Sequence, residues 1–222
     1  MLGMSVGNFP VTHVLVEEML PIKDELFISF FIDDRERGPA MLVSLVGGSG
    51  IEERAKDSSV VRRIACDVVD GPDLVSVRSL LAGSKIEAKY HEGIVGAVQG
   101  VFNAARASEA RSVEINPLVT LVDDGKANGT SLVAAADCRM TIDDYAVFRH
   151  PELGIEIARE LDHPPTELER IAYRIEQEDH RGTFFFAQMN AAAPGGKGLI
   201  LSLIHISEPT RLRRISYAVF CL

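Results

Sequence analysis

The chain has 222 residues, a length that fits one large domain or two small ones. Its 46% hydrophobic and 25% charged residues are typical of a globular protein and exclude collagen-like, low-complexity and disordered chains. The formal net charge of −9 argues against nucleic-acid and anionic-membrane partners, which need a basic face, but leaves small anionic ligands open.

The number and spacing of the cysteines indicate a reducing compartment. Cys66, Cys138 and Cys221 are too few and too widely spaced for a disulfide framework or a zinc site. No apolar run reaches the roughly 18 residues that cross a bilayer, and residues 1–8 lack the basic start of a signal peptide. We expect a cytoplasmic protein with no membrane partner. The mitochondrial matrix stays open, because we expect the true N-terminus to lie upstream.

The first part of the chain predicts a β-hairpin. Leu26–Ile32 is an apolar run too short for a helix and indicates a buried strand. Asp33–Pro39 then supplies a turn, and Ala40–Val46 the returning strand. Gly47–Gly50 ends this hairpin, and Ile51–Val69 is interpreted as a mixed, partly helical connection.

The middle of the chain predicts a helix followed by two strands. His91–Ala107 repeats its apolar residues at helical spacing: Ile94, Ala97, Val98, Val101, Phe102 and Ala105. Arg111–Thr120 is a predicted strand, Asp123–Thr130 a polar turn and Ser131–Ala136 a second strand. Thr141–Leu153 is expected to be irregular.

A second helix is predicted over Thr166–Glu178. Thr166 and Glu169 have the spacing of a capping box, in which each side chain accepts from the other residue's backbone N–H. Leu168, Ile171, Ala172 and Ile175 would form its apolar stripe. Thr183–Met189 is then predicted to be a buried strand.

Residues 201–222 do not resemble evolved protein sequence. Residues 201–211 are the translation of the end of a transposase-type sequencing adapter, and 215–222 match the downstream adapter of the same library design. The residues between them fit the length of the library index. We therefore expect a non-native tail. The alternative, a membrane-active tail with a basic cluster at Arg211, Arg213 and Arg214, fits less well.

Three polar residues form the most informative pattern. Glu114 and Asn116 lie two apart in a predicted strand, so both side chains project from the same face. If the two strands pair as a hairpin, Asp137 arrives beside Asn116. Such an all-oxygen cluster suits Mg²⁺ shared with substrate phosphates. On pattern alone, the favoured interpretation is a half-buried hairpin whose acids face solvent. An Asn just before the strand-ending Pro117 is evidence in the other direction, for a binding site.

Four segments, taken together and in order, resemble one protein family. They are Val14–Glu18 through Glu25-Leu26, Gly47-Gly48 through Ile51-Glu52, Glu114–Val119 and Asp143–Leu153. From about Val11 to Met189 the chain is similar to the β subunit of succinyl-CoA synthetase and its relatives, which include ATP-citrate lyase and malate–CoA ligase. These are ATP-grasp, nucleoside-diphosphate-forming acid–CoA ligases. The Glu-Ile-Asn-Pro-Leu-Val run is a specific motif, whereas the glycine pair is not.

The resemblance implies an α+β fold, the C-terminal part of an ATP-grasp fold with a mixed or antiparallel sheet and helices, truncated at both ends. Residues 1–140 would be a partial ATP-grasp domain. Residues 141–200 would hold a connector, a helix and the start of the link to an absent CoA-ligase domain. Residues 201–222 would be the non-native tail.

The resemblance also implies which residues bind Mg²⁺ and ATP or GTP. Asn116 and Asp137 would be the metal ligands. Glu17, Leu20 and Glu25 match the nucleotide contacts of the family. For Leu20, an ordinary apolar contact is an equally good interpretation.

Glu114 matches the carboxylate that positions a phosphohistidine in this family. An acid beside a histidine fixes its tautomer and stabilises its charged form during phosphoryl transfer. The alternative is a simple ion pair with a nearby arginine such as Arg111. No histidine of this chain has the Gly-His-Ala-Gly setting of the phosphohistidine. That residue is therefore expected on an α subunit or a fused domain.

The predicted function is the nucleotide- and Mg²⁺-binding portion of the β subunit of an ADP- or GDP-forming carboxylate–CoA ligase, an enzyme of the tricarboxylic acid cycle. A carboxylic acid and CoA would be the other substrates, and this fragment would be inactive alone. Val46 and Arg139 depart from the family, which commonly has an acid before the glycine pair and a lysine after the metal-binding Asp. They favour the alternative, a non-catalytic ATP-grasp-like nucleotide-binding or scaffold module.

Overall fold

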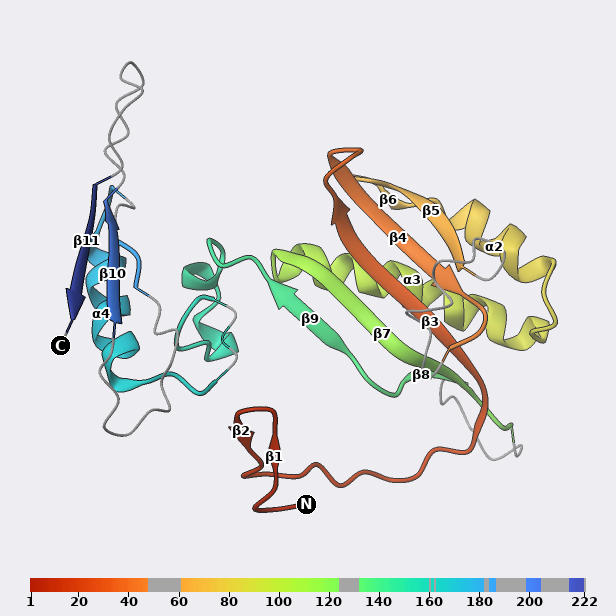
Figure 1. Ribbon diagram of the computed structural model, residues 1–222. Helices are drawn as coiled ribbons and strands as arrows, with labels where there is room; N and C mark the ends of the chain where they lie inside the picture. The colour runs from red at the N-terminus through yellow and green to blue at the C-terminus, as the bar shows by residue number, and fades with distance from the viewer. Residues whose placement is uncertain are drawn as a thin grey trace. The chain divides into compact units, whose positions relative to one another are not determined.

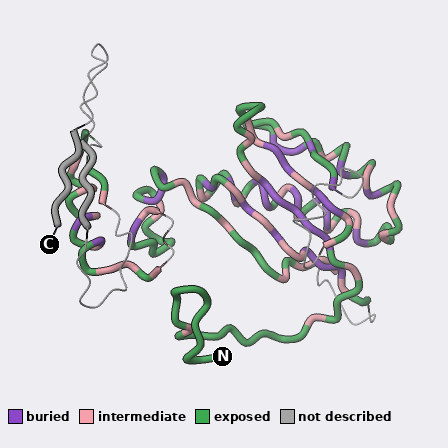
Figure 2. Tube along the Cα trace, in the orientation of Figure 1, coloured by how far each residue is buried: buried purple, intermediate pink, exposed green. Residues whose placement is uncertain are grey.

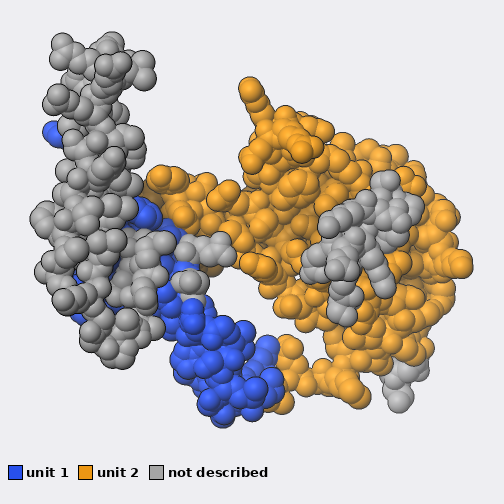
Figure 3. Space-filling view, viewed as in Figure 1, with its two compact units in different colours: residues 1–15, 156–222 blue, residues 16–155 orange. Residues whose placement is uncertain are grey.

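The chain divides into two compact units. The computed structural model describes residues 1–47, 61–123, 132–159, 161, 163–181 and 184–186, and the backbone of 199–204 and 216–221. One unit is Val16–Ile155, and the other combines Met1–Leu15 with Glu156–Leu222 (Figure 3). The domain boundaries expected at residues 140 and 200 stay a prediction. All six candidate site residues lie in the Val16–Ile155 unit.

An antiparallel sheet of seven strands forms the centre of the Val16–Ile155 unit (Figure 1). The strand order is β6-β5-β4-β3-β7-β8, and β9 also pairs with β7. The strands are β3 (Ile22–Asp33), β4 (Gly38–Ser44), β5 (Val61–Asp67), β6 (Gly71–Pro72), β7 (Ala110–Leu121), β8 (Val133–Ala135) and β9 (Arg139–Ile142). The two long strands β3 and β7 lie side by side and carry three of the six candidate site residues.

Two helices, α2 (Leu74–Ala82) and α3 (Ala88–Ala107), supply the apolar partners of the sheet. The buried stretches of β3, β4, β7 and α3 are visible in Figure 2. The core cluster joins helix residues such as Ile94, Val98 and Phe102 to the strand residues Leu26, Ile28, Met41, Val113, Ile115 and Leu118. We call the side of the sheet that carries these residues the helix face, and the other side the open face.

Most of the predicted elements are confirmed. The first predicted hairpin is β3–β4, with Ile28 opposite Val43. The predicted long helix is α3, and the predicted strand pair is β7–β8. The predicted polar turn at 123–130 lies almost wholly outside the described residues.

The structure differs from what was expected at three places in the Val16–Ile155 unit. The 51–69 connection, where it is described, is not helical: Val61–Asp67 is strand β5, paired with β4. Helix α2 was not expected. Residues Arg139–Ile142, which overlap the start of the irregular stretch, form strand β9. The sequence of β5 shows no alternation of apolar and polar residues, and only Val61 and Ile64 are buried. Pairing with β4 decides the conformation there.

The other unit contains shorter elements. They are β1 (Ser5–Val6), β2 (Phe9–Pro10), α4 (Glu167–Glu178), β10 (Leu199–Ile204) and β11 (Ser216–Cys221). The capping box at the start of α4 is confirmed, with both reciprocal hydrogen bonds present. Of its predicted apolar stripe only Ala172 is buried. Of the predicted strand Thr183–Met189, the described residues Phe184–Phe186 are not in a strand, and the rest lies outside the described residues.

Candidate functional site

The Glu114–Val119 segment lies on β7, and its side chains alternate as predicted as far as Asn116. Val113 and Ile115 are buried in the core, so they define the helix face of this strand. Glu114 and Asn116 are half-buried and lie on the open face. The sequence therefore placed these two polar side chains on the correct side of the sheet.

The strand pairing brings Asp137 opposite Asn116. On one side of this position Leu118 pairs with Ala135, and on the other Glu114 pairs with Arg139. Both pairs have the same register, and that register places Asp137 opposite Asn116. Asp137 is exposed, and one of its carboxylate oxygens accepts from the backbone N–H of Cys138 at 2.8 Å. The hairpin expected from the sequence is therefore the one that forms.

A bulge in β7 lies at the same position. Leu26 pairs with Leu118 and Ile28 with Ile115, so β7 has one more residue than β3 between these pairs. The extra residue falls at Asn116-Pro117, whose peptide bond is cis. Bulges of this kind re-aim side chains and are common beside functional sites.

The amide oxygen of Asn116 is buried and accepts no hydrogen bond within the part of the chain that the structure describes. Most buried polar atoms in folded proteins have a partner, because an unpaired one costs about 1–3 kcal/mol. An unpaired oxygen opposite a carboxylate is a suitable ligand for a hard cation or a suitable acceptor for a donor from a bound molecule.

The alternative interpretation of Glu114, as the partner of a nearby arginine, concerns Arg139 and not Arg111. Among the described residues, none of the ion pairs involves Glu114 or Arg111. Arg139 of β9 lies directly opposite Glu114 instead. Directly opposed residues of an antiparallel pair have neighbouring side chains on the same face. Arg139 is therefore the cation placed to influence Glu114.

The three predicted nucleotide contacts are only partly brought to this face. Glu25 follows Asp24 on β3, precedes the buried Leu26 and is exposed on the open face, opposite Val119. Glu17 and Leu20 lie in the segment before β3, and no described contact joins them to Asn116 or Asp137. Four of the six candidate residues thus share one face, and two lie just beyond the strand that carries Glu25.

The first residue of the predicted glycine pair is in close contact with β3. The backbone N–H of Gly47 donates to the carbonyl oxygen of Glu25 at 2.7 Å. A Cβ atom at this position would lie 2.5 Å from the carbonyl oxygen of Leu26. Only glycine fits so close to another backbone segment. Gly48 lies outside the described residues.

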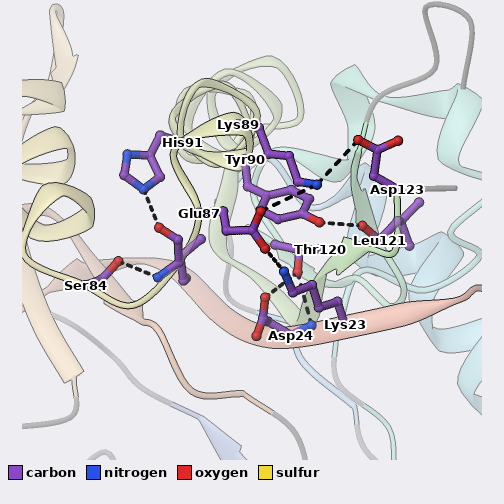
Figure 4. Close-up of polar contacts among 11 residues, drawn as sticks. Lys23, Asp24, Ser84, Glu87, Lys89, Tyr90, His91, Thr120, Leu121 and Asp123 are labelled. Carbon is purple, nitrogen blue, oxygen red and sulfur yellow. Dashed lines mark hydrogen bonds and ion pairs between the residues drawn. The ribbon is translucent and has the colours of Figure 1, made fainter. Parts of the chain in front are cut away.

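Two polar networks beside β3 and β7 were not predicted. One joins Lys23 and Asp24 of β3 to the start of α3 and the end of β7 (Figure 4). The other lies at the α3–β7 turn, where Arg149 donates two hydrogen bonds of 2.7 Å to Glu109. These bonds, together with one from His150, lower the pKa of Glu109 to about 2. Asp24 and Thr120 are 96 residues apart, and Arg149 and Glu109 are 40 apart, so no local pattern indicates these bonds.

Other possible sites are weaker. No group of three or more His, Cys, Asp or Glu residues that could hold a metal occurs among the described residues. Likewise, no described helix is long and apolar enough to cross a membrane. An apolar hollow between α3 and β7–β8, lined in part by Gly93 and Ala97, lies on the helix face. The candidate site residues Glu114 and Asn116 lie on the other side of the sheet.

The chain matches a known class of protein. The family model for the ATP-grasp domain matches residues 4–120, more than half of the chain. The chain therefore belongs to the ATP-grasp domain family, as the sequence resemblance indicated.

The similar proteins are more specific. A β subunit of ADP-forming succinate–CoA ligase from Archaeoglobus fulgidus is 33% identical over 169 residues, which covers 76% of this chain and 42% of that protein. The β subunit from Ignicoccus hospitalis is 29% identical over 205 residues, or 90% of this chain and 50% of that protein. The chain thus spans half or less of the length of these curated relatives. It is homologous to the β subunits of succinate–CoA ligases.

A solved structure supports the fold assignment. ATP citrate lyase from Methanothrix soehngenii, solved with citrate and coenzyme A, matches with a TM-score of 0.54. The identity is 18%, and the match covers 84% of this chain and 37% of that one. This likeness shows that the α+β architecture is shared.

Proposed function

We propose that this chain is the Mg²⁺- and nucleotide-binding portion of the β subunit of an ADP- or GDP-forming carboxylate–CoA ligase of the succinyl-CoA synthetase type. The observation that carries the proposal is the buried, unpaired amide oxygen of Asn116, which the strand register places opposite Asp137. These are the two residues that the resemblance implies as metal ligands. Homology to succinate–CoA ligase β subunits supports the reaction class.

The donor set fits Mg²⁺. One amide oxygen and one carboxylate suit an ion that completes its shell with water and phosphate. When bound, Mg²⁺ would neutralise charge that develops on the transferred phosphoryl group. Asn116 and Asp137 would hold it on the open face of the sheet.

The nucleotide would contact the segment Glu17–Glu25. The carbonyl oxygen of Glu25 is already occupied by Gly47, so its exposed carboxylate is the group left to accept from ribose hydroxyls. Leu20 is half-buried and offers an apolar surface to a base. Glu17 is exposed and adds a second carboxylate at the start of the segment.

Glu114 would orient a phosphohistidine supplied by an α subunit or a fused domain. Its half-buried carboxylate can accept from one imidazole nitrogen, which fixes the tautomer and stabilises the charged ring. The phosphoryl group would then pass to a carboxylic acid, and CoA would displace phosphate. This chain would contribute only to binding the phosphates and the metal in this series of reactions. We therefore expect negligible acyl-CoA formation by the 222 residues alone.

The proposal is tested with Mn²⁺ as a paramagnetic probe for the Mg²⁺ site. In the presence of ADP, Mn²⁺ should broaden the amide NMR signals that flank Asn116 and Asp137 and leave those of α2 sharp. Asn116→Ala and Asp137→Ala should each weaken Mn²⁺–ADP binding at least about tenfold, because each removes a direct ligand. In a complete ligase carrying this sequence, both variants should sharply reduce turnover with Mg–ATP.

The matched control is Asp34→Ala, which removes an exposed acid from the β3–β4 turn without touching the open face. It should bind Mn²⁺–ADP as the wild type does. Equal binding by the wild type and the Asp137→Ala variant would remove the metal assignment. Measurable acyl-CoA synthesis by the isolated chain would contradict the proposal that this chain supplies only part of the active site.

A second candidate is a non-catalytic nucleotide-binding or scaffold module. The specific observation in its favour is Arg139, which lies opposite Glu114 and could neutralise the carboxylate that would otherwise serve a phosphohistidine. In a complete ligase, Glu114→Gln would then leave turnover unchanged, whereas the ligase proposal expects a loss of phosphoryl transfer with nucleotide binding preserved.

A further inference from the structure

A second bulge lies in β3, between the predicted nucleotide contacts Leu20 and Glu25. Ile22 pairs with Leu121 and Asp24 with Thr120, so β3 has one more residue than β7 at Lys23. An extra residue bends and twists the strand that carries it. The path of the chain from Leu20 to Glu25 therefore depends on what holds this bulge.

Asp24 and Thr120 bond to each other in both directions across the bulge. The Asp24 backbone N–H donates to the hydroxyl oxygen of Thr120 at 3.1 Å, and that hydroxyl donates to the Asp24 carboxylate at 2.8 Å. Thr120 is fully buried. Figure 4 shows the two residues side by side. A buried hydroxyl with both hydrogen-bonding roles filled has a fixed geometry, because loss of either partner leaves a polar group unsatisfied.

The bulged residue is held from the other side. Lys23 forms an ion pair with Glu87 just before α3, and its ammonium group lies 5.3 Å from the centre of the Tyr90 ring. The hydroxyl of Tyr90 donates to the carbonyl oxygen of Leu121 at 2.8 Å (Figure 4). The bulge thus joins three elements, β3, α3 and the end of β7.

We propose that Asp24 and Thr120 are positioning residues for nucleotide binding: their reciprocal hydrogen bonds fix the bulge at Lys23 and so set Leu20 relative to Glu25. The inference rests on the proposed function, which assigns Leu20 and Glu25 to nucleotide binding. Neither Asp24 nor Thr120 need touch the ligand. Without the bulge, the residues before Asp24 would shift by one position against β7 and carry Leu20 along a different path, while the buried Leu26 keeps Glu25 in place.

The test compares Thr120→Val with Thr120→Ser in the full chain. Val keeps the shape but removes the hydroxyl, and Ser keeps the hydroxyl. In Thr120→Val, amide hydrogen exchange at Asp24 should accelerate about tenfold, as expected for one lost hydrogen bond, and the Kd for ADP should rise about tenfold. Thr120→Ser should retain both values. Asp24→Ala, which removes the acceptor of the Thr120 hydroxyl, should also weaken ADP binding.

The matched control is Ser84→Ala. The Ser84 hydroxyl also donates to one backbone group, the carbonyl of Leu81, and accepts from another, the N–H of Ile86, but it lies between α2 and α3. It should leave the Kd for ADP unchanged. If Thr120→Val and Asp24→Ala bind ADP as the wild type does, the positioning role is overturned and the proposed function stands. If the wild type fails to bind ADP, the proposed function falls, and the inference with it.

Discussion

The two faces of the central sheet use the same strands for different tasks. On the helix face, Leu26, Ile115 and Leu118 pack against α3 and are almost completely buried. On the open face, the intervening positions hold Glu25, Glu114 and Asn116, with Asp137 opposite. Because side chains alternate along a strand, one stretch of β7 can stabilise the fold and present ligands at once. Stability and binding should therefore be separable by mutating adjacent residues.

The largest expected effect is on the helix face. Leu118→Ala removes a side chain that is 1% exposed, and such truncations cost about 2–5 kcal/mol because a cavity remains. Urea unfolding should show a much lower midpoint. Val122→Ala, at an exposed position just after β7, is the control and should change the free energy of unfolding by less than about 0.5 kcal/mol. A small effect at Leu118 would mean that the helix face does not hold the fold together.

A smaller and opposite effect is expected on the open face. Asn116→Ala removes a buried acceptor that has no partner among the described residues. The free energy of unfolding should therefore stay within about 1 kcal/mol of the wild type, or rise, because the unpaired oxygen itself is unfavourable. Binding of Mn²⁺–ADP should nonetheless fall. Destabilisation as large as that of Leu118→Ala would erase the distinction between the faces.

A weaker, pH-dependent contribution is expected from the α3–β7 turn. The pKa of His150 is raised, first by its hydrogen bond with Glu152 and then by that with Glu109, so its stabilising effect is complete below about pH 6.5 and is lost as the pH rises. The pKa of Glu109 is lowered to about 2, chiefly by Arg149, so its effect is present above about pH 4.5 and is lost on acidification. The contribution of this cluster to stability should therefore be greatest between these values.

Thermal unfolding between about pH 5 and 8 tests this expectation. The His150→Asn variant should lose part of the decline in Tm that the wild type shows on the alkaline side. His13→Asn, at an exposed position in the other unit, should follow the wild-type curve. If Tm changes with pH in the same way for the wild type and His150→Asn, the cluster does not contribute to the pH dependence of stability.

The smallest expected effect is that of the tail. If residues 201–222 derive from an adapter, their removal should leave the Tm of the Val16–Ile155 unit unchanged, because no native packing selected them. The source DNA should then read into a different sequence after codon 200. A tail that is truly encoded, and whose removal lowers the Tm, would contradict this prediction.

The sequence alone determined the elements whose pattern is local. The alternation of Val113, Glu114, Ile115 and Asn116 gave the faces of β7, and the apolar spacing of α3 gave a helix that is buried on one side. The capping box of α4 was likewise visible, since both of its partners lie within one turn. Glu114 and Asn116 were placed on the same face for the same reason.

Tertiary structure decided everything that depends on a neighbouring strand. Strand β5 exists because β4 pairs with it, and neither bulge can be read from one strand, since a bulge is a mismatch in length between two. The Asp24–Thr120 pair joins residues 96 positions apart. Local periodicity reports which side of an element is apolar; it carries no information on register, and register brings Asn116 to Asp137.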